Sequence, residues 1–200
     1  VTATGRLRLV GCPGGTLLGR RLLDCHTGPA KLVGTLHLQE ETHGVSGLSH
    51  FDDQGGSRMV DVSGKVATLR VARASGCIRM LPAVLQLIRD RRVAKGDVLE
   101  VARLAGIMAA KRTGELIPLC HPVPVESVTV AFSFPDESTV KVESRVQVTA
   151  RTGVEMEALT AVSVTLLTIY DMCKGVDRRM VLGAIQLEEK SGGRSGHFER

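Results

Sequence analysis

Residues 128–148 of the chain, VTVAFSFPDESTVKVESRVQV, contain the pattern that decides the fold class. Apolar residues alternate with polar or small residues on both sides of the segment PDES at 135–138. Such alternation is typical of strands with one buried face, and two of them around a short turn predict a β-hairpin. The alternating positions are Val128, Val130, Phe132, Phe134, Val140, Val142, Val146 and Val148.

Helical patterns lie on either side of this hairpin in the sequence. Apolar residues recur at the i, i+3, i+4 and i+7 spacing over 97–112, which predicts a helix with one buried face. A longer helix is predicted over 154–174, apolar or small nearly all round in its middle and followed by a glycine. Pro82 opens a shorter helix. With strand patterns at 66–74 and 180–188, these elements predict an α+β fold, helices packing on one side of an antiparallel sheet.

Residues 1–46 differ from the rest of the chain. Glycine and proline recur there and no apolar period persists. We predict a linker or a loosely ordered N-terminal arm, within which residues 5–10 could add an edge strand, and a folded domain over 47–200. The chain begins with Val1, which we interpret as a processed, spliced or fused start.

The composition is that of a globular protein with an aliphatic core. Hydrophobic residues make up 43% of the chain, aromatic residues 2%, and the formal net charge is +5. The charge suits anionic small molecules. The scarcity of aromatic residues weakens a role in binding single-stranded nucleic acid, whose bases stack on aromatic rings. No apolar stretch approaches ~18 residues, so no membrane span is predicted.

The five cysteines are an odd number and form no C-x-x-C pair. We therefore predict free thiols in a reducing compartment, either the cytoplasm or the mitochondrial matrix. A zinc site from Cys120, His121 and Cys173 is an alternative, although no structural zinc spacing is present.

Two segments favour acid/base chemistry. In LIPLCHPVP at 116–124, three prolines impose a rigid extended path on Cys120 and His121, and a fixed histidine suits proton transfer near neutral pH. A structural loop is the alternative. In the helix at 154–174, Asp171 and Lys174 share a face directly after the most apolar stretch. At the edge of an apolar wall the pKa values of a carboxylate and an amine shift readily, which suits acid/base work. An ordinary surface ion pair is the alternative.

Glutamates lie at the start of the same helix. Glu155 and Glu157 occupy its first turn, where the helix dipole stabilises carboxylates. For Glu157 we favour a capping role.

Lysines and arginines favour a phosphate-bearing substrate. Lys190 and Arg194 lie in the glycine-rich segment EKSGGRSGH, and Lys95 and Lys111 lie at opposite ends of the helix at 97–112. Glycines allow a backbone to approach phosphate oxygens closely, although the P-loop order is absent. A flexible tail and helix-end solvation are the alternatives. Together with the acid/base candidates, these cations predict a pocket for a polyphosphate.

Four long strings resemble the MoaC-type cyclic pyranopterin monophosphate synthases of molybdenum cofactor biosynthesis. Their length and common order make the resemblance specific, and it covers roughly three quarters of the chain. The strings are HFDDQGGSRMVDVSGK at 50–65, KGDVLEVARLAGIMAAKRTGELIPLCHPVP at 95–124, RTGVEMEALTAVSVTLLTIYDMCK at 151–174 and EKSGGRSGH at 189–197.

The resemblance implies a lyase that converts 3′,8-cyclo-7,8-dihydroguanosine 5′-triphosphate into cyclic pyranopterin monophosphate with release of pyrophosphate. It also implies a ferredoxin-like fold and a homo-oligomer, a hexamer of dimers with sites between subunits. No cofactor is implied, although Mg²⁺ can accompany the triphosphate. The radical SAM GTP cyclase of the same pathway is the implied pathway or fusion partner, and neither nucleic acid nor a membrane is an expected partner.

The resemblance also assigns roles by motif position. The implied catalytic residues are Asp171, Lys174, Lys190, Lys95 and His121. The implied substrate-binding residues are Leu119, Cys120, His121, Glu155, Met156 and Lys111, and no metal ligand is implied.

Helix geometry suggests that each site is shared between chains. Glu155 and Asp171 lie in one predicted helix, ~24 Å apart along its axis and on nearly opposite faces. A nucleotide triphosphate is too short to bridge that span, so we expect each residue to serve a different site. A nucleotide-binding regulatory module and a nucleic-acid-binding domain are the rival functions; neither explains why these strings occur together.

Overall fold

The structure is a computed structural model that describes residues 54–200. The predicted arm at 1–46 and the candidate strand at 5–10 lie outside the described residues.

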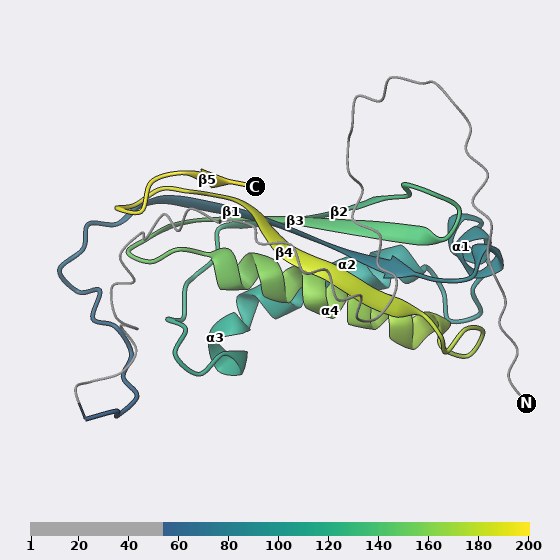
Figure 1. The fold of residues 1–200 in the computed structure, drawn as a ribbon, viewed down its shortest axis with the longest axis horizontal. Coiled ribbons are helices and arrows are strands. Elements are labelled where there is room, and N and C mark those ends of the chain that lie inside the picture. Colours follow the sequence, from purple (N-terminus) through teal and green to yellow (C-terminus); the bar gives the residue numbers. More distant parts are fainter. Residues whose placement is uncertain (1–53) are drawn as a thin grey trace, which may run out of the picture. The chain divides into compact units, whose positions relative to one another are not determined.

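A five-stranded antiparallel sheet forms one layer of the domain (Figure 1). Its strands lie in the order β2-β3-β1-β4-β5. They are β1 (Thr68–Arg79), β2 (Ser127–Ser133), β3 (Thr139–Ala150), β4 (Val181–Ser191) and β5 (Phe198–Glu199). The central strand β1 pairs with β3 along its whole length, from Thr68↔Ala150 to Arg79↔Thr139.

Helices cover one face of this sheet (Figure 1). They are α1 (Pro82–Arg89), α2 (Val98–Lys111), α3 (Thr113–Leu116) and α4 (Glu155–Cys173). The predicted α+β fold, with helices on one side of an antiparallel sheet, is confirmed.

The hairpin pattern places one face of β3 in the core. Val140, Val142, Val146 and Val148 are fully buried, and Ser144 on the same face donates a hydrogen bond to the Ala158 carbonyl oxygen of α4 (2.8 Å). Burial of an aliphatic side chain of this size stabilises a fold by ~1.5–3 kcal/mol, so this strand holds α4 firmly against the sheet.

Close packing of α2 on α4 depends on Gly106. A Cβ atom at this position would overlap the Thr165 hydroxyl and lie 3.0 Å from the Ala161 carbonyl oxygen. The Thr165 hydroxyl is itself occupied, because it donates to that carbonyl (2.7 Å). A residue with a side chain at this position would force the two helices apart, so glycine is required where α2 crosses the middle of α4.

Several element bounds differ from the prediction. Strands β1 and β4 extend to Arg79 and Ser191, beyond the predicted 66–74 and 180–188. The turn of helix α3 and the two-residue strand β5 were not predicted, because neither is long enough to show a period.

Helix α4 corrects the statement that no apolar stretch approaches the length of a membrane span. This helix has 19 residues and a mean hydropathy of 1.3, so by length and composition it is long and apolar enough to cross a membrane. Half of the apolar window is buried within the domain, where α4 packs on β1, β3, β4 and α2. The core helix of a globular domain passes the same test, so the correction carries no membrane assignment.

Candidate active site

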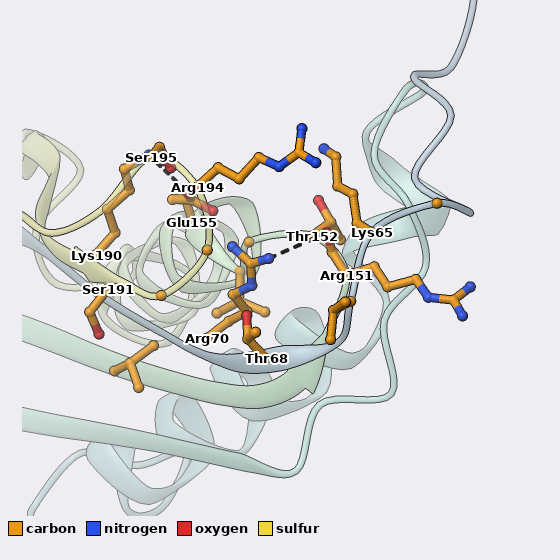
Figure 2. A pocket seen from close by; sticks show the side chains of 17 residues that line it. Lys65, Thr68, Arg70, Arg151, Thr152, Glu155, Lys190, Ser191, Arg194 and Ser195 are labelled. Atoms are coloured by element: carbon orange, nitrogen blue, oxygen red, sulfur yellow. Dashed lines mark hydrogen bonds and ion pairs between the residues drawn. The ribbon is translucent and has the colours of Figure 1, made fainter.

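A cationic hollow of about 550 Å³ lies where β1, β4 and the start of α4 meet (Figure 2). Five cationic side chains and one carboxylate, Glu155, line it. The cations are Lys65, Arg70, Arg151, Lys190 and Arg194. Figure 2 shows the Arg151 side chain extending away from the other four. Such an excess of positive charge suits a ligand with several negative charges.

Arg70, in strand β1, is the most deeply buried of these cations, with only 9% of its surface exposed. Its Nε donates to the Ala150 carbonyl oxygen (3.3 Å) and its Nη2 to the Arg151 carbonyl oxygen (3.5 Å). These contacts anchor one edge of the guanidinium to the end of β3. A guanidinium held in this way keeps its orientation, which favours bidentate recognition of an anion.

The glycine-rich segment after β4 wraps around Arg70. Gly192 and Gly193 have φ angles of +96° and +77°. A Cβ at Gly192 would overlap the Leu69 carbonyl oxygen, and one at Gly193 would overlap the Arg70 guanidinium. Both backbone conformation and space therefore require glycine here. In the structure this segment forms a wall of the hollow, with residues 190–195 among its lining.

Lys190 and Glu155 meet inside the hollow, whereas the sequence resemblance grouped Lys190 with Asp171 and Lys174. The Lys190 Nζ lies 3.4 Å from Glu155 Oε1 and 3.2 Å from the Ser195 hydroxyl oxygen. Lys190 comes from β4 and Glu155 from the first turn of α4, so the pair joins two elements.

A second hollow of about 650 Å³ adjoins the first and shares Lys65, Thr152, Gly153 and Glu155 with it. Its remaining lining includes four predicted site residues, Leu119, Cys120, His121 and Met156. The structure thus brings together six of the predicted site residues around the start of α4. These are Lys190, Glu155, Met156, Leu119, Cys120 and His121.

Glu157 has a larger role than the capping predicted for it. Its side chain is 1% exposed, its Oε1 accepts from the Cys120 thiol (Sγ–Oε1 3.7 Å), and its Oε2 has no hydrogen-bond partner within residues 54–200. Burial raises the pKa of the Glu157 carboxyl. Burial, and then Glu157, raise the pKa of the Cys120 thiol to about 11. The thiol therefore stays protonated at neutral pH, and Glu157 supports the segment that carries His121.

Asp171, Lys174 and Lys95 form a separate group at the other end of α4. Lys174 Nζ lies 2.6 Å from Asp171 Oδ1, and Lys95 Nζ lies 3.7 Å from Asp171 Oδ2 and 2.9 Å from the Asp171 carbonyl oxygen. The hydrogen bond and charge of Lys174, and then the charge of Lys95, lower the pKa of the Asp171 carboxyl. Asp171 in turn raises the pKa of the Lys174 ammonium. All three side chains are more than half exposed, so they are accessible and their attraction is weakened by water.

The two groups are distant within one chain. Glu155 and Asp171 belong to the single helix α4, ~24 Å apart along its axis. Lys111, at the exposed end of α2, lines neither hollow.

The zinc alternative is not supported. Cys120 lies beside the first turn of α4 and Cys173 is its last residue. Within residues 54–200, no group of three or more metal-ligating side chains is close enough to hold a metal ion.

Comparisons with known proteins identify the family of the chain. The model of the MoaC family matches residues 59–193. The chain belongs to the MoaC family. Relatives in the family include the cyclic pyranopterin monophosphate synthase of Magnetococcus marinus, 62% identical over 158 residues that cover 78% of this chain and 96% of the relative. Cyclic pyranopterin monophosphate synthase 3 of Mycobacterium tuberculosis is 60% identical over 153 residues, covering 76% of this chain and 86% of the relative. The enzyme of the same name in Pelotomaculum thermopropionicum is 58% identical over 157 residues, covering 78% and 92%.

Sequence reasoning about this MoaC-family chain missed three lining cations, Lys65, Arg70 and Arg151. Arg70 lies within the apolar run VATLRVARA, and a charged residue in such a run was the available signal. Lys65 and Arg151 fall inside strings that carry the family resemblance, but neither was given a role.

Proposed function

We propose that this chain is a cyclic pyranopterin monophosphate synthase. In molybdenum cofactor biosynthesis this lyase converts 3′,8-cyclo-7,8-dihydroguanosine 5′-triphosphate into cyclic pyranopterin monophosphate and pyrophosphate. Membership of the MoaC family and relatives of that name at 58–62% identity support this function.

The observation that carries the proposal is the cationic hollow around Arg70. Departure of pyrophosphate builds up negative charge, and cations fixed in advance stabilise that charge without reorganising. Arg70 is fixed by two carbonyl oxygens and Lys190 by Glu155 and Ser195, so both are organised before substrate arrives. We assign the triphosphate to this hollow, with Lys65 and Arg194 as further contacts.

The adjoining hollow suits the base and ribose of the substrate. It carries apolar groups from Leu119, Met156 and Ile117, and His121 at the same wall. Leu119, Cys120, His121, Glu155 and Met156 are the proposed substrate-binding residues here, and His121 also relays protons. Lys111 keeps its proposed role in substrate binding from the family resemblance alone.

Asp171, Lys174 and Lys95 are the proposed acid/base group, and Lys190 joins them from the cationic hollow. A rearrangement of purine into pterin requires proton donors and acceptors, and each contributes roughly 10²- to 10⁴-fold in rate. A carboxylate that is hydrogen-bonded to one ammonium group and ion-paired with a second offers both kinds within one group.

We further propose that each active site combines the start of α4 from one chain with the end of α4 from another. The separation of ~24 Å within one helix supports this assignment, because one substrate cannot span it. Exposed apolar residues also support a homo-oligomer, proposed as a hexamer of dimers. Val101, Leu104 and Met108 form a stripe along α2, 46%, 62% and 39% exposed. With α1–α3 taken together, the elements from β1 to β4 follow the order β-α-β-β-α-β. This order and the strand order β2-β3-β1-β4 support a ferredoxin-like arrangement.

The remaining expectations complete the proposal. No resident cofactor is assigned, and Mg²⁺ enters as a companion of the triphosphate. The radical SAM GTP cyclase is the proposed supplier of substrate. The proposed compartment is the cytoplasm or the mitochondrial matrix. Residues 1–46 are proposed to form a linker or arm joined to a synthase domain over 47–200.

The decisive experiment incubates the purified chain with the cyclised nucleotide and measures pyrophosphate together with the fluorescent oxidised pterin. Both products should appear in equal amounts. Binding of the nucleotide without release of pyrophosphate would instead identify a regulatory module.

A further inference from the structure

A third hollow, of about 350 Å³, lies between the end of α1, the start of α2 and the edge strand β2. It shares no lining residue with the two hollows of the candidate active site. Its floor is apolar, formed by Ile88, Leu99 and the rings of Phe132 and Phe134. Three arginines and two carboxylates line the rest. Five of its nine lining residues are therefore charged, which suits a ligand that combines an apolar part with a charged group.

The charges of this hollow leave one cation unmatched. Arg103 pairs with Glu100 (3.2 Å), and Arg91 pairs with Asp97 (3.4 Å). The Arg89 guanidinium lies over the Phe134 ring (4.7 Å to its centre) and has no carboxylate partner within residues 54–200. Three guanidinium groups against two carboxylates leave one positive charge, which suits a ligand with one negative charge.

Arg91 holds a backbone conformation that needs explanation. Its φ angle is +55°, at the position after α1 where its N–H bonds to the Ile88 carbonyl oxygen (3.1 Å) and the Arg92 N–H to that of Leu87 (2.9 Å). This helix-ending motif usually has glycine there, because other residues pay a steric cost. The arginine instead carries its guanidinium to Asp97, whose other oxygen caps α2 at Leu99 and Glu100. Strain of this kind is a sign of function when it orients a charged group.

The same segment carries Lys95. Lys95 lies between Arg91 and Asp97 and is followed by Gly96 with a φ angle of +99°. Its ammonium donates to the Asp171 carbonyl oxygen. An anion bound to Arg89 and Arg91 would compete with Asp97 for Arg91, and Asp97 is two residues from Lys95. The hollow therefore lies next to the segment that carries one member of the acid/base group.

The Arg103 guanidinium lies over the Phe132 ring (5.0 Å to its centre), as Arg89 lies over that of Phe134. We propose that this hollow binds a small aromatic carboxylate, with its carboxylate on Arg89 and Arg91 and its ring against the apolar floor beside these two arginine–phenylalanine pairs, and that its occupancy shifts the segment that carries Lys95. The binding part is independent of the proposed lyase function, whereas any effect on turnover rests on the role proposed for Lys95.

The test titrates the full chain with 2-naphthoate, whose fluorescence can be followed directly because the chain has no tryptophan. Saturable binding is expected, and Arg89→Gln should weaken it at least ~10-fold, since a charge-assisted contact is lost. The neutral analogue 2-naphthamide should bind at least ~10-fold more weakly to the wild-type chain for the same reason. Arg145→Gln is the matched control, because Arg145 lies on the opposite face of the sheet, where it donates to the Gln147 side chain, and does not line the hollow; this variant should bind like wild type.

Amide NMR provides the second readout. The Gly96 signal should shift during the naphthoate titration in the wild-type chain, and the shift should be lost at the same concentrations in Arg89→Gln. Equal binding by wild type and Arg89→Gln, competition by inorganic pyrophosphate, or no binding at all would each overturn the proposal. So would binding that appears only when the oligomer is diluted to monomers, because the hollow would then be an interface between copies. None of these measurements uses the cyclised nucleotide, so their failure is distinct from a failure of the lyase function.

Discussion

Replacing Gly193 by alanine tests whether Arg70 must remain where the structure places it. The new Cβ would overlap the Arg70 guanidinium, so Arg70 has to leave its position against the Ala150 and Arg151 carbonyl oxygens. Gly196→Ala is the matched control in the same segment. Gly196 also has a positive φ angle (+67°), but a Cβ there would meet nothing within 4 Å. Both variants pay the same backbone strain of ~1–2 kcal/mol, and only one of them displaces Arg70.

The difference between the two variants therefore isolates the arginine. A charge-assisted hydrogen bond contributes ~1.5–3 kcal/mol, which corresponds to a loss of roughly 10- to 150-fold in kcat/KM for Gly193→Ala relative to Gly196→Ala. Steady-state release of pyrophosphate measures this ratio, and thermal melting of both proteins confirms that each is folded at the assay temperature. Gly193→Ala should melt lower, because Arg70 also loses its two hydrogen bonds. If the two variants have the same kcat/KM, Arg70 does not hold the triphosphate and the assignment of the cationic hollow is wrong.

The remaining predictions concern the acid/base group. Asp171→Asn and Lys174→Ala should each lower pterin formation by at least ~100-fold with an unchanged melting temperature, since both side chains are exposed; activity above about a tenth of wild type in both would contradict their role. Inactive Glu155→Ala and Asp171→Ala proteins, mixed after subunit exchange, should recover about a quarter of wild-type activity, because half of randomly formed dimers are mixed and each mixed dimer has one of two sites intact. No recovery despite proven exchange would place the site within one chain. Lys174→Ala should also raise the pKa of the Asp171 carboxyl, followed by carbon NMR, because the largest cause of its lowering is removed. A carboxyl whose pKa is lowered by folding stabilises the fold at pH values above its ordinary pKa, and this stabilisation is lost as the pH falls through the lowered pKa. The Lys174→Ala variant should therefore lose less stability than wild type on acidification. An unchanged Asp171 titration would show that the ion pair does not form in solution.

Local patterns predicted the fold where one residue period persisted. The hairpin strands and α4 each alternate or recur over enough residues to identify their buried faces, and the structure confirms them. Strand β1 was predicted too short because its second half, around Ser75 and Cys77, places small and polar residues in a strand that pairs on both sides. Such a strand is stabilised by pairing partners far away in the sequence, which no local window contains.

The candidate site was predictable only in part for the same reason. His121, Glu155 and Lys190 were identified from motifs, and the structure places them around one pair of adjoining hollows. Arg70 was missed because its significance depends on the glycine segment that wraps it, more than 100 residues later in the chain. The separation of Asp171 from Glu155 followed from helix geometry alone, since both lie in one unbroken helix.

The protonated thiol of Cys120 has a practical consequence. Alkylating reagents attack the thiolate, and the thiols of Cys120 and Cys173 both have pKa values raised to about 11, so they react slowly while the domain is folded. Cys120 lies over Glu157 at one end of α4 and Cys173 ends the helix at the other. Cys173 is fully buried, so the rate at which it is labelled, resolved by peptide mass spectrometry, reports how often that end of α4 opens. Half-buried Cys120 lines the second hollow, so its rate reports access to that hollow. Two native cysteines thus report on different events, local unfolding at one end of α4 and occupancy of the second hollow at the other.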